Sequence, residues 1–417
     1  MSNTQLRQAN TLRALPQNNI PTYFLSYHKN LTKKPDGEKH LKKGSLNILN
    51  LDIIGFACQT KNQLSGSFKM KISISIGSAY YNGEDWDDLV DYTQEADKLG
   101  VDQAWSAEAW GMDAIVPLAY LAAKTEKIKL GTGILQISSR VPSMMAMTAQ
   151  SLDTVSKGRF ILGLGVSGPQ VVEGLHGASF AKPLSRLREC VEILRIALAG
   201  EKIAFEGEHY LLPRPGGEGK AIRLSQPPRP ELPIYLATLG PKSLQMTGEL
   251  ANGWLGTCFL PEHASVFLDD LSTGTKKAGR SLNDIDIQAG GYFEISDDVE
   301  GLINKLRPGM AFTLGAMGSA KTNFYNDAYC RAGYEEVAKE VQSLWVAGNR
   351  DEAIRQVPDE LITMSNFIGT QSMVEERLDA FKAAGVNTLR ISTGGSTWKE
   401  RTAALEKAMD SISKAAT

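Results

Sequence analysis

The sequence lacks several features that mark whole classes of protein. Its 45 Lys and Arg residues against 47 Asp and Glu leave a formal net charge of −2, so no excess of basic charge favours nucleic acid or an anionic membrane as a partner. The four cysteines form no CxxC pair, and no two of the five histidines stand four residues apart. Neither a metal site nor a disulfide framework is indicated. These absences favour a small-molecule substrate.

Long apolar segments are also scarce. The longest one near the start, residues 49–58, is interrupted by Asn50 and Asp52 and is too short to span a bilayer. No signal-peptide cleavage pattern follows a basic start. We therefore expect a cytoplasmic protein with reduced thiols, in which Cys190 and Cys258 pack as small apolar residues.

Residues 1–69 differ from the rest of the chain. They are rich in Asn, Gln, Thr, Lys and Ser, include a charged run over 33–43, and show no sustained helix or strand period. We predict a poorly ordered extension there, and a single domain over residues 70–417 that begins at Met70. Loss of fold or activity on deletion of residues 1–69 would contradict this expectation.

From Met70 onward, short apolar strands alternate with amphipathic helices, which predicts helices covering a parallel sheet. The expected strands are 71–77, 101–107, 128–133, 159–165, 233–237, 253–257, 284–294 and 386–392. The expected helices are 86–99, 113–125, 142–156, 184–199, 241–250, 261–278 and 398–414, with a hairpin over 202–212, a Gly/Pro-rich loop over 213–230 and a mostly helical region over 297–385. Eight strands over roughly 345 residues favour an α/β fold, a (β/α)8 TIM barrel with an insertion region, over an open sheet.

The strongest functional signal is an apolar strand that runs into the glycine-rich turn Gly-Leu-Gly-Val-Ser-Gly at 163–168. Glycines let the backbone approach a ligand closely, successive free N–H groups can cradle a phosphate, and Ser167 adds a hydroxyl donor. The alternative is that the glycines only form a tight turn. The turn also matches the G-x-G-x-x-G dinucleotide fingerprint, but it follows a fourth strand and Pro169 comes directly after it. A Rossmann dehydrogenase is therefore a minor alternative.

The end of the third expected strand carries a second signal. In a barrel, the carboxyl ends of the strands meet the ligand. Gly133 next to Ile134 permits an unusual backbone shape, even a cis peptide, that could press a bulge against a flat ring. Arg140 could pair with an anionic tail or a phosphate. A plain strand end with a surface arginine is equally compatible with the spacing.

The second expected strand ends near Glu108 and Trp110, where a carboxylate could exchange a proton and an indole could line an apolar ring pocket. Capping of the next helix by Glu108 or Asp113 is the alternative. Among the histidines, His176 follows the glycine-rich turn and is the best-placed catalytic candidate, although a structural role is commoner for a histidine in such a loop.

Several runs, in the same order along the chain, resemble the bacterial luciferase-like superfamily. They are Leu-Gly-Thr-Gly-Ile at 130–134, Leu-Asp-Thr-Val-Ser-Lys-Gly-Arg-Phe at 152–160, the glycine-rich run at 162–174, Pro-Ile-Tyr-Leu-Ala at 233–237 and Glu-Leu-Ala-Asn-Gly-Trp at 249–254. Within that superfamily the chain is most similar to coenzyme F420-dependent oxidoreductases related to methylenetetrahydromethanopterin reductase. The similarity extends from about residue 70 to the C-terminus.

The resemblance implies a TIM barrel that binds a deazaflavin, which passes hydride at its C5 atom. It makes Gly133–Ile134 a non-prolyl cis bulge behind the ring and places Glu108 and Trp110 near the reacting atoms. The cofactor-binding candidates are Gly133, Ile134, Arg140, Gly165, Val166, Ser167, Gly168, Gln170 and Val171, and the catalytic candidates are Glu108, Trp110 and His176. Two departures matter: Asn252 replaces a common Asp, and Ala109 stands where some sugar-phosphate dehydrogenase relatives have a catalytic His. The second departure argues against glucose-6-phosphate dehydrogenase activity.

We therefore expect a cytoplasmic F420-dependent oxidoreductase that acts on a small organic substrate. Homodimers are common among relatives. One alternative is an FMN-dependent luciferase-like monooxygenase that receives reduced FMN from a partner. Another is a non-catalytic barrel that binds a flavin or deazaflavin.

Overall fold

A computed structural model of the protein describes residues 70–76, 85–319 and 321–415, and the extension expected over residues 1–69 lies outside them. In this part of the chain, parallel strands form a closed ring of β1 (Lys71–Ser75), β2 (Gln103–Ser106), β3 (Lys129–Thr132), β5 (Phe160–Gly165), β8 (Ile234–Leu236), β9 (Gly253–Leu255), β10 (Asp286–Ile295) and β12 (Thr388–Thr393). Neighbours in that order pair in parallel, and β12 pairs with β1. The predicted eight-stranded barrel is confirmed.

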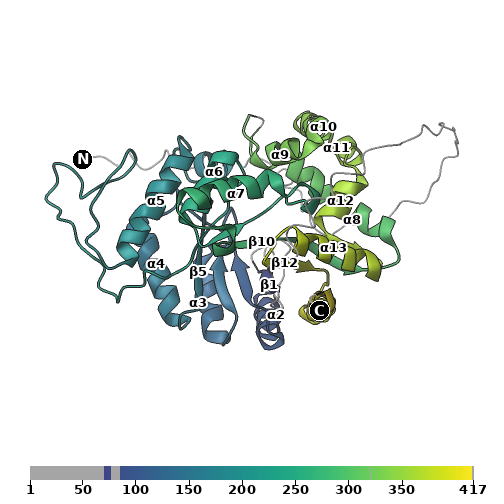
Figure 1. Ribbon diagram of the computed structural model, residues 1–417, viewed down its shortest axis with the longest axis horizontal. Helices are drawn as coiled ribbons and strands as arrows, with labels where there is room; N and C mark the ends of the chain where they lie inside the picture. Colours follow the sequence, from purple (N-terminus) through teal and green to yellow (C-terminus); the bar gives the residue numbers. More distant parts are fainter. Residues whose placement is uncertain (1–69, 77–84, 320, 416–417) are drawn as a thin grey trace, which may run out of the picture.

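Helices cover the outside of this ring (Figure 1). They are α2 (Trp86–Leu99), α3 (Ile115–Lys124), α4 (Pro142–Val155), α5 (Pro183–Leu198), α6 (Pro241–Leu250), α7 (Ser265–Lys277), α13 (Gln371–Ala383) and α14 (Trp398–Ala415). Local chemistry sets their ends. The carboxylate of Asp85 accepts from the N–H of Asp87 at the start of α2, and Gly100 ends that helix at a φ of 87°. Among the described helices, none combines the length and apolar character that a bilayer span requires.

Two insertions interrupt the βα alternation. The first contains the predicted hairpin, in which β6 (Phe205–Glu206) and β7 (Leu211–Leu212) pair antiparallel. The second follows β10 and contains α8 (Val299–Gly315), α9 (Phe324–Tyr329), α10 (Glu335–Val346), α11 (Arg350–Arg355) and α12 (Asp359–Ser365), which gather on one side of the barrel (Figure 1). This second insertion has an apolar cluster of its own.

The sequence did not predict two short strands. β11 (Phe367–Gly369), within the region expected to be mostly helical, pairs with the last residues of β10. β4 (Leu135–Gln136) pairs with the end of β5. Strands of two or three residues are too short to show an alternating pattern, so periodicity could not reveal them.

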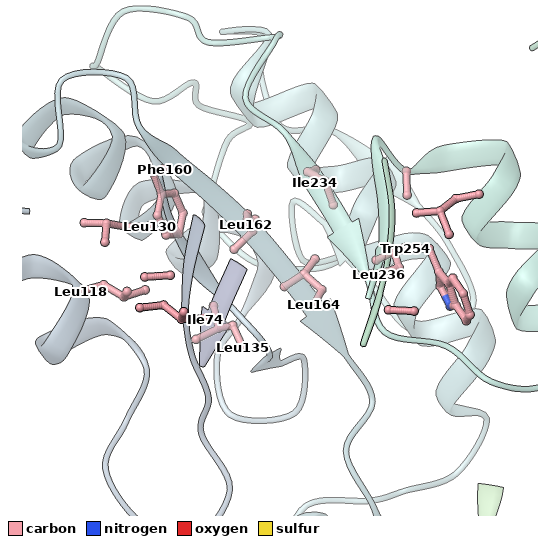
Figure 2. Packing of buried hydrophobic residues seen from close by; sticks show 14 of the residues in the cluster. Ile74, Leu118, Leu130, Leu135, Phe160, Leu162, Leu164, Ile234, Leu236 and Trp254 are labelled. Carbon is pink, nitrogen blue, oxygen red and sulfur yellow. The ribbon is translucent and has the colours of Figure 1, made fainter. Parts of the chain in front are cut away.

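The main core lies between the outer face of the ring and the helices. Figure 2 shows part of it, with Ile74, Leu118, Leu130, Phe160, Leu162 and Trp254 among the labelled side chains. Cys190 is fully buried in this core, as predicted.

Polar and aromatic side chains fill the inside of the ring at the amino ends of the strands. Asp286 accepts hydrogen bonds there from the Lys71 ammonium at 3.1 Å, the Tyr235 hydroxyl at 2.7 Å and the Thr388 hydroxyl at 2.8 Å. This end of the barrel is therefore closed by its own side chains, and a ligand has to enter from the carboxyl ends.

Ionic contacts tie three outer helices together. Glu249 at the end of α6 accepts from Arg188 of α5 at 3.1 and 2.8 Å and from Lys277 of α7 at 2.9 Å. Hydrogen bonding to Arg188, with a further contribution from Lys277, lowers the pKa of Glu249 to about 2.

Asn252, which departs from the family pattern, also has a structural role. Its side-chain oxygen accepts from the Ile234 N–H at 3.0 Å and from Arg195 at 2.6 Å. The amide oxygen thus provides the acceptor that a carboxylate would provide at this position, at the base of β8 and far from the strands' carboxyl ends.

Candidate active site

Sequence-distant candidate residues meet at the carboxyl ends of three neighbouring strands. β2, β3 and β5 are consecutive in the ring. Glu108 follows β2, Ile134 follows β3, and the turn at 166–168 follows β5. Because all strands are parallel, these segments lie on the same face of the barrel.

A bulge follows β3. The Gly133–Ile134 peptide bond is cis, as predicted. The Gly133 N–H donates to the Ser106 carbonyl at 2.7 Å, and the Glu108 N–H donates to the Ile134 carbonyl at 3.3 Å. The partly buried Ile134 packs against the cluster of Trp105 and other side chains inside the barrel. The bulge is thus held between the end of β2 and the barrel interior.

The three glycines of the glycine-rich motif differ in the space that surrounds them. A Cβ at position 163 would overlap the carbonyl oxygen of Thr132, and one at 165 would lie 2.6 Å from Cδ1 of Ile134. A Cβ at 168 would meet only the side chain of Gln170, at 4.0 Å. Gly163 and Gly165 therefore make room for β3 and its bulge, whereas only Gly168 faces open space. Together with the closed barrel, this excludes the Rossmann alternative.

The turn after β5 forms a cradle of backbone N–H groups, which we call the anion cradle and define as Val166, Ser167 and Gly168. Ser167 has a φ of 59°, in the left-handed region. Within the described parts of the chain, none of these three N–H groups has a hydrogen-bond acceptor. Successive N–H groups around a left-handed residue form a concave site for an anion.

The chain after the anion cradle is fixed by its own hydrogen bonds. The Val171 N–H donates to the Gly168 carbonyl at 3.1 Å, at the start of the π-helix η2 (Gln170–Leu175). Val171 is buried, and because its N–H already donates to Gly168, that group is not available to a ligand. The Gln170 side-chain amide donates to the Gly318 carbonyl and so connects this loop to the helical insertion.

Glu108 and Arg140 form an ion pair, which the sequence did not predict. Arg140 donates to the two carboxylate oxygens at 2.8 and 3.0 Å, and Glu108 is only 8% exposed. The same carboxylate accepts from the Ser139 hydroxyl at 3.1 Å and from the backbone N–H groups of Gln136 at 3.1 Å and Ala114 at 3.4 Å. Arg140 thus has an anionic partner within the protein, and Glu108 holds the segment behind the bulge in place.

Asp113 caps the start of α3, as the alternative reading of this segment expected. Its carboxylate accepts from the N–H groups of Ile115 at 2.8 Å and Val116 at 3.0 Å, at the start of α3. Trp110, between Glu108 and this cap, is 62% exposed.

His176 contacts a polar residue that sequence reasoning missed. Its Nε2 atom lies 2.8 Å from the side-chain nitrogen of Gln136, whose oxygen accepts from Ser138 at 3.2 Å. The Gln136 amide therefore donates to Nε2, so neutral His176 carries its proton on Nδ1. The available signal was the polar Gln-Ile-Ser-Ser run at 136–139, one residue after the bulge, which places three hydrogen-bonding side chains next to the expected ligand.

The remaining ionisable groups show no metal site in the described ranges 70–76, 85–319 and 321–415, where no group of three or more His, Cys, Asp or Glu residues could hold an ion. Burial raises the pKa of the Cys190 thiol and that of the Cys258 thiol to about 12. Both thiols therefore stay protonated at neutral pH and are poor nucleophiles.

The structure is a closed (β/α)8 barrel with a bulge after its third strand and a turn of backbone N–H groups without acceptors after its fourth, both at the carboxyl ends of the strands. The match to known families is more specific. The chain belongs to the luciferase-like monooxygenase family, whose model matches residues 67–388. The superfamily expected from the sequence motifs is therefore confirmed.

Curated relatives share much of the chain. A protein of Mycobacterium tuberculosis named as a coenzyme F420-dependent oxidoreductase is 38% identical over 335 residues, which cover 78% of this chain and 96% of that protein. The 5,10-methylenetetrahydromethanopterin reductase of Archaeoglobus fulgidus is 28% identical over 296 residues, which cover 71% of this chain and 86% of that enzyme.

Solved structures have the same fold. The F420-dependent tetrahydromethanopterin reductase of Methanopyrus kandleri matches with a TM-score of 0.66 and 22% identity, over 81% of this chain and 98% of that one. An F420-dependent secondary alcohol dehydrogenase, in complex with an F420-acetone adduct, matches with a TM-score of 0.66 and 18% identity, over 82% and 99%.

Proposed function

We propose that the protein is a coenzyme F420-dependent oxidoreductase that transfers a hydride between the deazaflavin and a small organic substrate. The observation that carries the proposal is the anion cradle, because its three N–H groups without acceptors fit the phosphate of a cofactor whose ring reaches the bulge at Ile134. FMN also carries a phosphate. The names of the curated relatives favour F420.

In this proposal, each part of the site has a separate task. Ile134 supports the ring, Gly165 leaves room for Ile134, and Ser167 adds its hydroxyl to the anion cradle. The bound cofactor supplies the carbon that accepts or gives the hydride. The chain holds the substrate carbon within roughly 3–3.5 Å of it and excludes water.

His176 is the better-placed group to hold or deliver the accompanying proton. Its Nε2 atom lies 2.8 Å from the side-chain nitrogen of Gln136, which orients the ring from the bulge side. The oxygens of Glu108 already accept from four partners, which favours a positioning role for the ion pair with Arg140. The exposed Trp110 lies at the rim of the same face and could cover the ring.

The test is the cofactor that copurifies from a host that makes both F420 and FMN, because deazaflavin and flavin absorb differently. The proposal expects F420, and exchange of hydride with reduced F420 on a substrate panel. Bound FMN together with oxygen consumption on addition of reduced FMN would instead establish the monooxygenase alternative. Bound F420 without turnover on a broad panel would indicate the non-catalytic barrel.

We also propose a homodimer located in the cytoplasm. The packed helices α3 and α4 expose an apolar face, with Val116 61%, Tyr120 42%, Met144 49%, Met147 47% and Val155 55% exposed. An apolar face of this kind favours a second copy as its partner. Cys190, Cys258 and Cys330 are free thiols, which fits a reducing compartment. Sedimentation should give a dimer that Met144→Lys dissociates, and a wild-type monomer would contradict the proposal.

A further inference from the structure

The helical insertion after β10 covers part of the face on which the anion cradle lies. Arg331 of the insertion donates to the carbonyl of Leu239, which follows β8, and Leu260, which follows β9, is buried in the apolar cluster of the insertion. The Gln170 amide donates to the Gly318 carbonyl and ties the insertion to the loop after the anion cradle. The insertion therefore extends over the carboxyl ends of β8 and β9 toward that of β5.

A cavity of about 310 Å³ lies between the insertion, the end of β9 and the part of β10 that extends past its pairing with β9. Its lining includes Phe259 after β9, Gly291 of β10, Met310 of α8, Tyr325 of α9 and Ile362 of α12. Small-molecule sites in proteins commonly measure about 300–1,000 Å³, so a cavity at the lower end of this range fits a small organic molecule.

The cavity lies across the barrel from the bulge. β10 is opposite β3 in the ring, with β5, β8 and β9 between them on one side and β2, β1 and β12 on the other. In the proposed function, the deazaflavin ring rests on Ile134 of the bulge that follows β3. A molecule that occupies the cavity therefore approaches the ring from the side away from the bulge.

The lining of the cavity carries no charge: among the described residues that form it, none is an Asp, Glu, Lys, Arg or His. Its ionisable groups are neutral at physiological pH, because burial raises the pKa of Cys258 and that of Tyr325 to about 12 and raises the pKa of Tyr329 well above its usual range. An ionic ligand would lose its hydration here and gain no counter-charge, so the cavity favours an uncharged ligand.

Tyr325 provides a hydrogen-bonding group that the protein itself does not use. Other hydroxyls of the lining have partners: that of Thr313 donates to a carbonyl of α8 at 2.9 Å, and that of Ser365 donates to a carbonyl of α12 at 2.6 Å. The hydroxyl of the half-buried Tyr325 has no hydrogen-bond partner in the part of the chain that the structure describes. Because buried tyrosine hydroxyls usually find a partner, this one is available to a ligand.

We propose that this cavity is the substrate site and takes an uncharged molecule with an apolar or aromatic body, whose carbonyl or hydroxyl oxygen accepts a hydrogen bond from Tyr325. The inference rests on the proposed function, because it names the substrate class of the same site. Phe259 and Met310 supply apolar surface for the body. Tyr325 determines specificity for the oxygen, whereas the proton of the reaction remains with His176.

The test titrates three probes by calorimetry into protein saturated with F420. Acetophenone has an aromatic body and a carbonyl oxygen, ethylbenzene has a similar body without the oxygen, and benzoate carries a negative charge. The wild type should bind acetophenone at least about tenfold more tightly than benzoate, because the cavity offers no counter-charge. Tyr325→Phe removes only the hydroxyl and should weaken acetophenone binding roughly 2- to 13-fold, the effect of one hydrogen bond, with ethylbenzene binding unchanged.

Two further variants serve as controls. Tyr334→Phe makes the same change within the insertion, at a residue outside the cavity lining whose hydroxyl contacts Sδ of Met364 at 3.6 Å, and should bind all three probes like the wild type. Met310→Trp fills the cavity and should prevent binding of acetophenone and ethylbenzene, with little change in the Kd for F420. Tyr325→Phe should melt at or above the wild-type temperature, because the hydroxyl that it removes has no partner among the described residues.

Absence of acetophenone binding to the wild type, or unchanged affinity in Tyr325→Phe, with F420 bound normally, would overturn this inference alone. Benzoate bound as tightly as acetophenone would overturn the assignment of an uncharged substrate. A lower melting temperature of Tyr325→Phe, with an equal loss of affinity for ethylbenzene, would show that the hydroxyl is structural. Failure of the wild type to bind F420, with acetophenone still bound through Tyr325, would overturn the proposed function and leave the cavity as a ligand site without a substrate role.

Discussion

Replacing Ser167 by glycine should separate the backbone cost of the anion cradle from its binding role. Ser167 has a φ of 59°, and the left-handed conformation costs an L residue roughly 1–2 kcal/mol. Glycine removes this cost but adds about 0.5–1 kcal/mol of chain entropy lost on folding, so the free protein should gain about 0.5–1 kcal/mol. The same change removes a hydroxyl donor. A hydrogen bond to a charged group contributes about 1.5–3 kcal/mol, so the Kd for F420 should rise roughly 10- to 150-fold.

Two measurements check this prediction. Urea unfolding without cofactor gives the stability of the free protein, and fluorescence titration with F420 gives the Kd, while kcat at saturating F420 should stay close to the wild-type value. The matched control is Lys157→Gly, because Lys157 also has a φ of 59° but lies between α4 and β5, at the opposite end of the strand. It should gain similar stability with no change in Kd. An unchanged Kd in Ser167→Gly would refute the assignment of the anion cradle, and a fall in kcat alone would place Ser167 in the chemistry instead.

Three further changes test the rest of the site and the fold. Glu108→Gln should lower turnover with little loss of F420 affinity and should lower the free energy of unfolding by about 1–3 kcal/mol, because Arg140 loses its carboxylate partner; unchanged turnover in steady-state assays would remove Glu108 from the mechanism. Gly165→Ala places a Cβ 2.6 Å from Ile134 and should weaken F420 binding about tenfold, by displacing the bulge; wild-type affinity in the titration would show that Ile134 does not contact the ring. Glu249 has a pKa of about 2, below its usual 4.5, so its stabilising contacts should be complete above pH 4.5 and lost as the pH falls toward 2. The difference in urea midpoint between wild type and Glu249→Gln should therefore shrink over that range, and a constant difference would contradict the pKa.

The eight barrel strands could be predicted because each is an apolar segment bounded by turn residues. The glycine-rich turn and the Gly133–Ile134 bulge could be located as well, because each is encoded by adjacent residues at a strand end. The roles within the turn could not be assigned in the same way. Gly163 and Gly168 look equivalent in the sequence, yet one packs against a carbonyl of β3 and the other faces open space. Only the pairing of β3 with β5 distinguishes them.

The partners of charged residues could not be predicted from the sequence either. Arg140 was expected to meet an anion, and in the structure it meets Glu108, 32 residues earlier in the chain. The contact depends on how the bulge turns the segment after β3 back toward the end of β2. No periodicity in the sequence reports that geometry, because it arises from pairing between strands that are distant in sequence.

The cofactor side and the substrate side of the barrel are encoded differently, and this explains which of them the sequence reveals. The anion cradle and the bulge are each built from consecutive residues, so they form motifs that can be found in one sequence. The cavity between β9, β10 and the helical insertion is lined by residues such as Cys258, Tyr325 and Asn366, which lie far apart in the sequence. A barrel that keeps one cofactor and changes substrates can vary these scattered positions without disturbing the contiguous motifs, because the loops at the carboxyl ends of the strands vary independently of the ring.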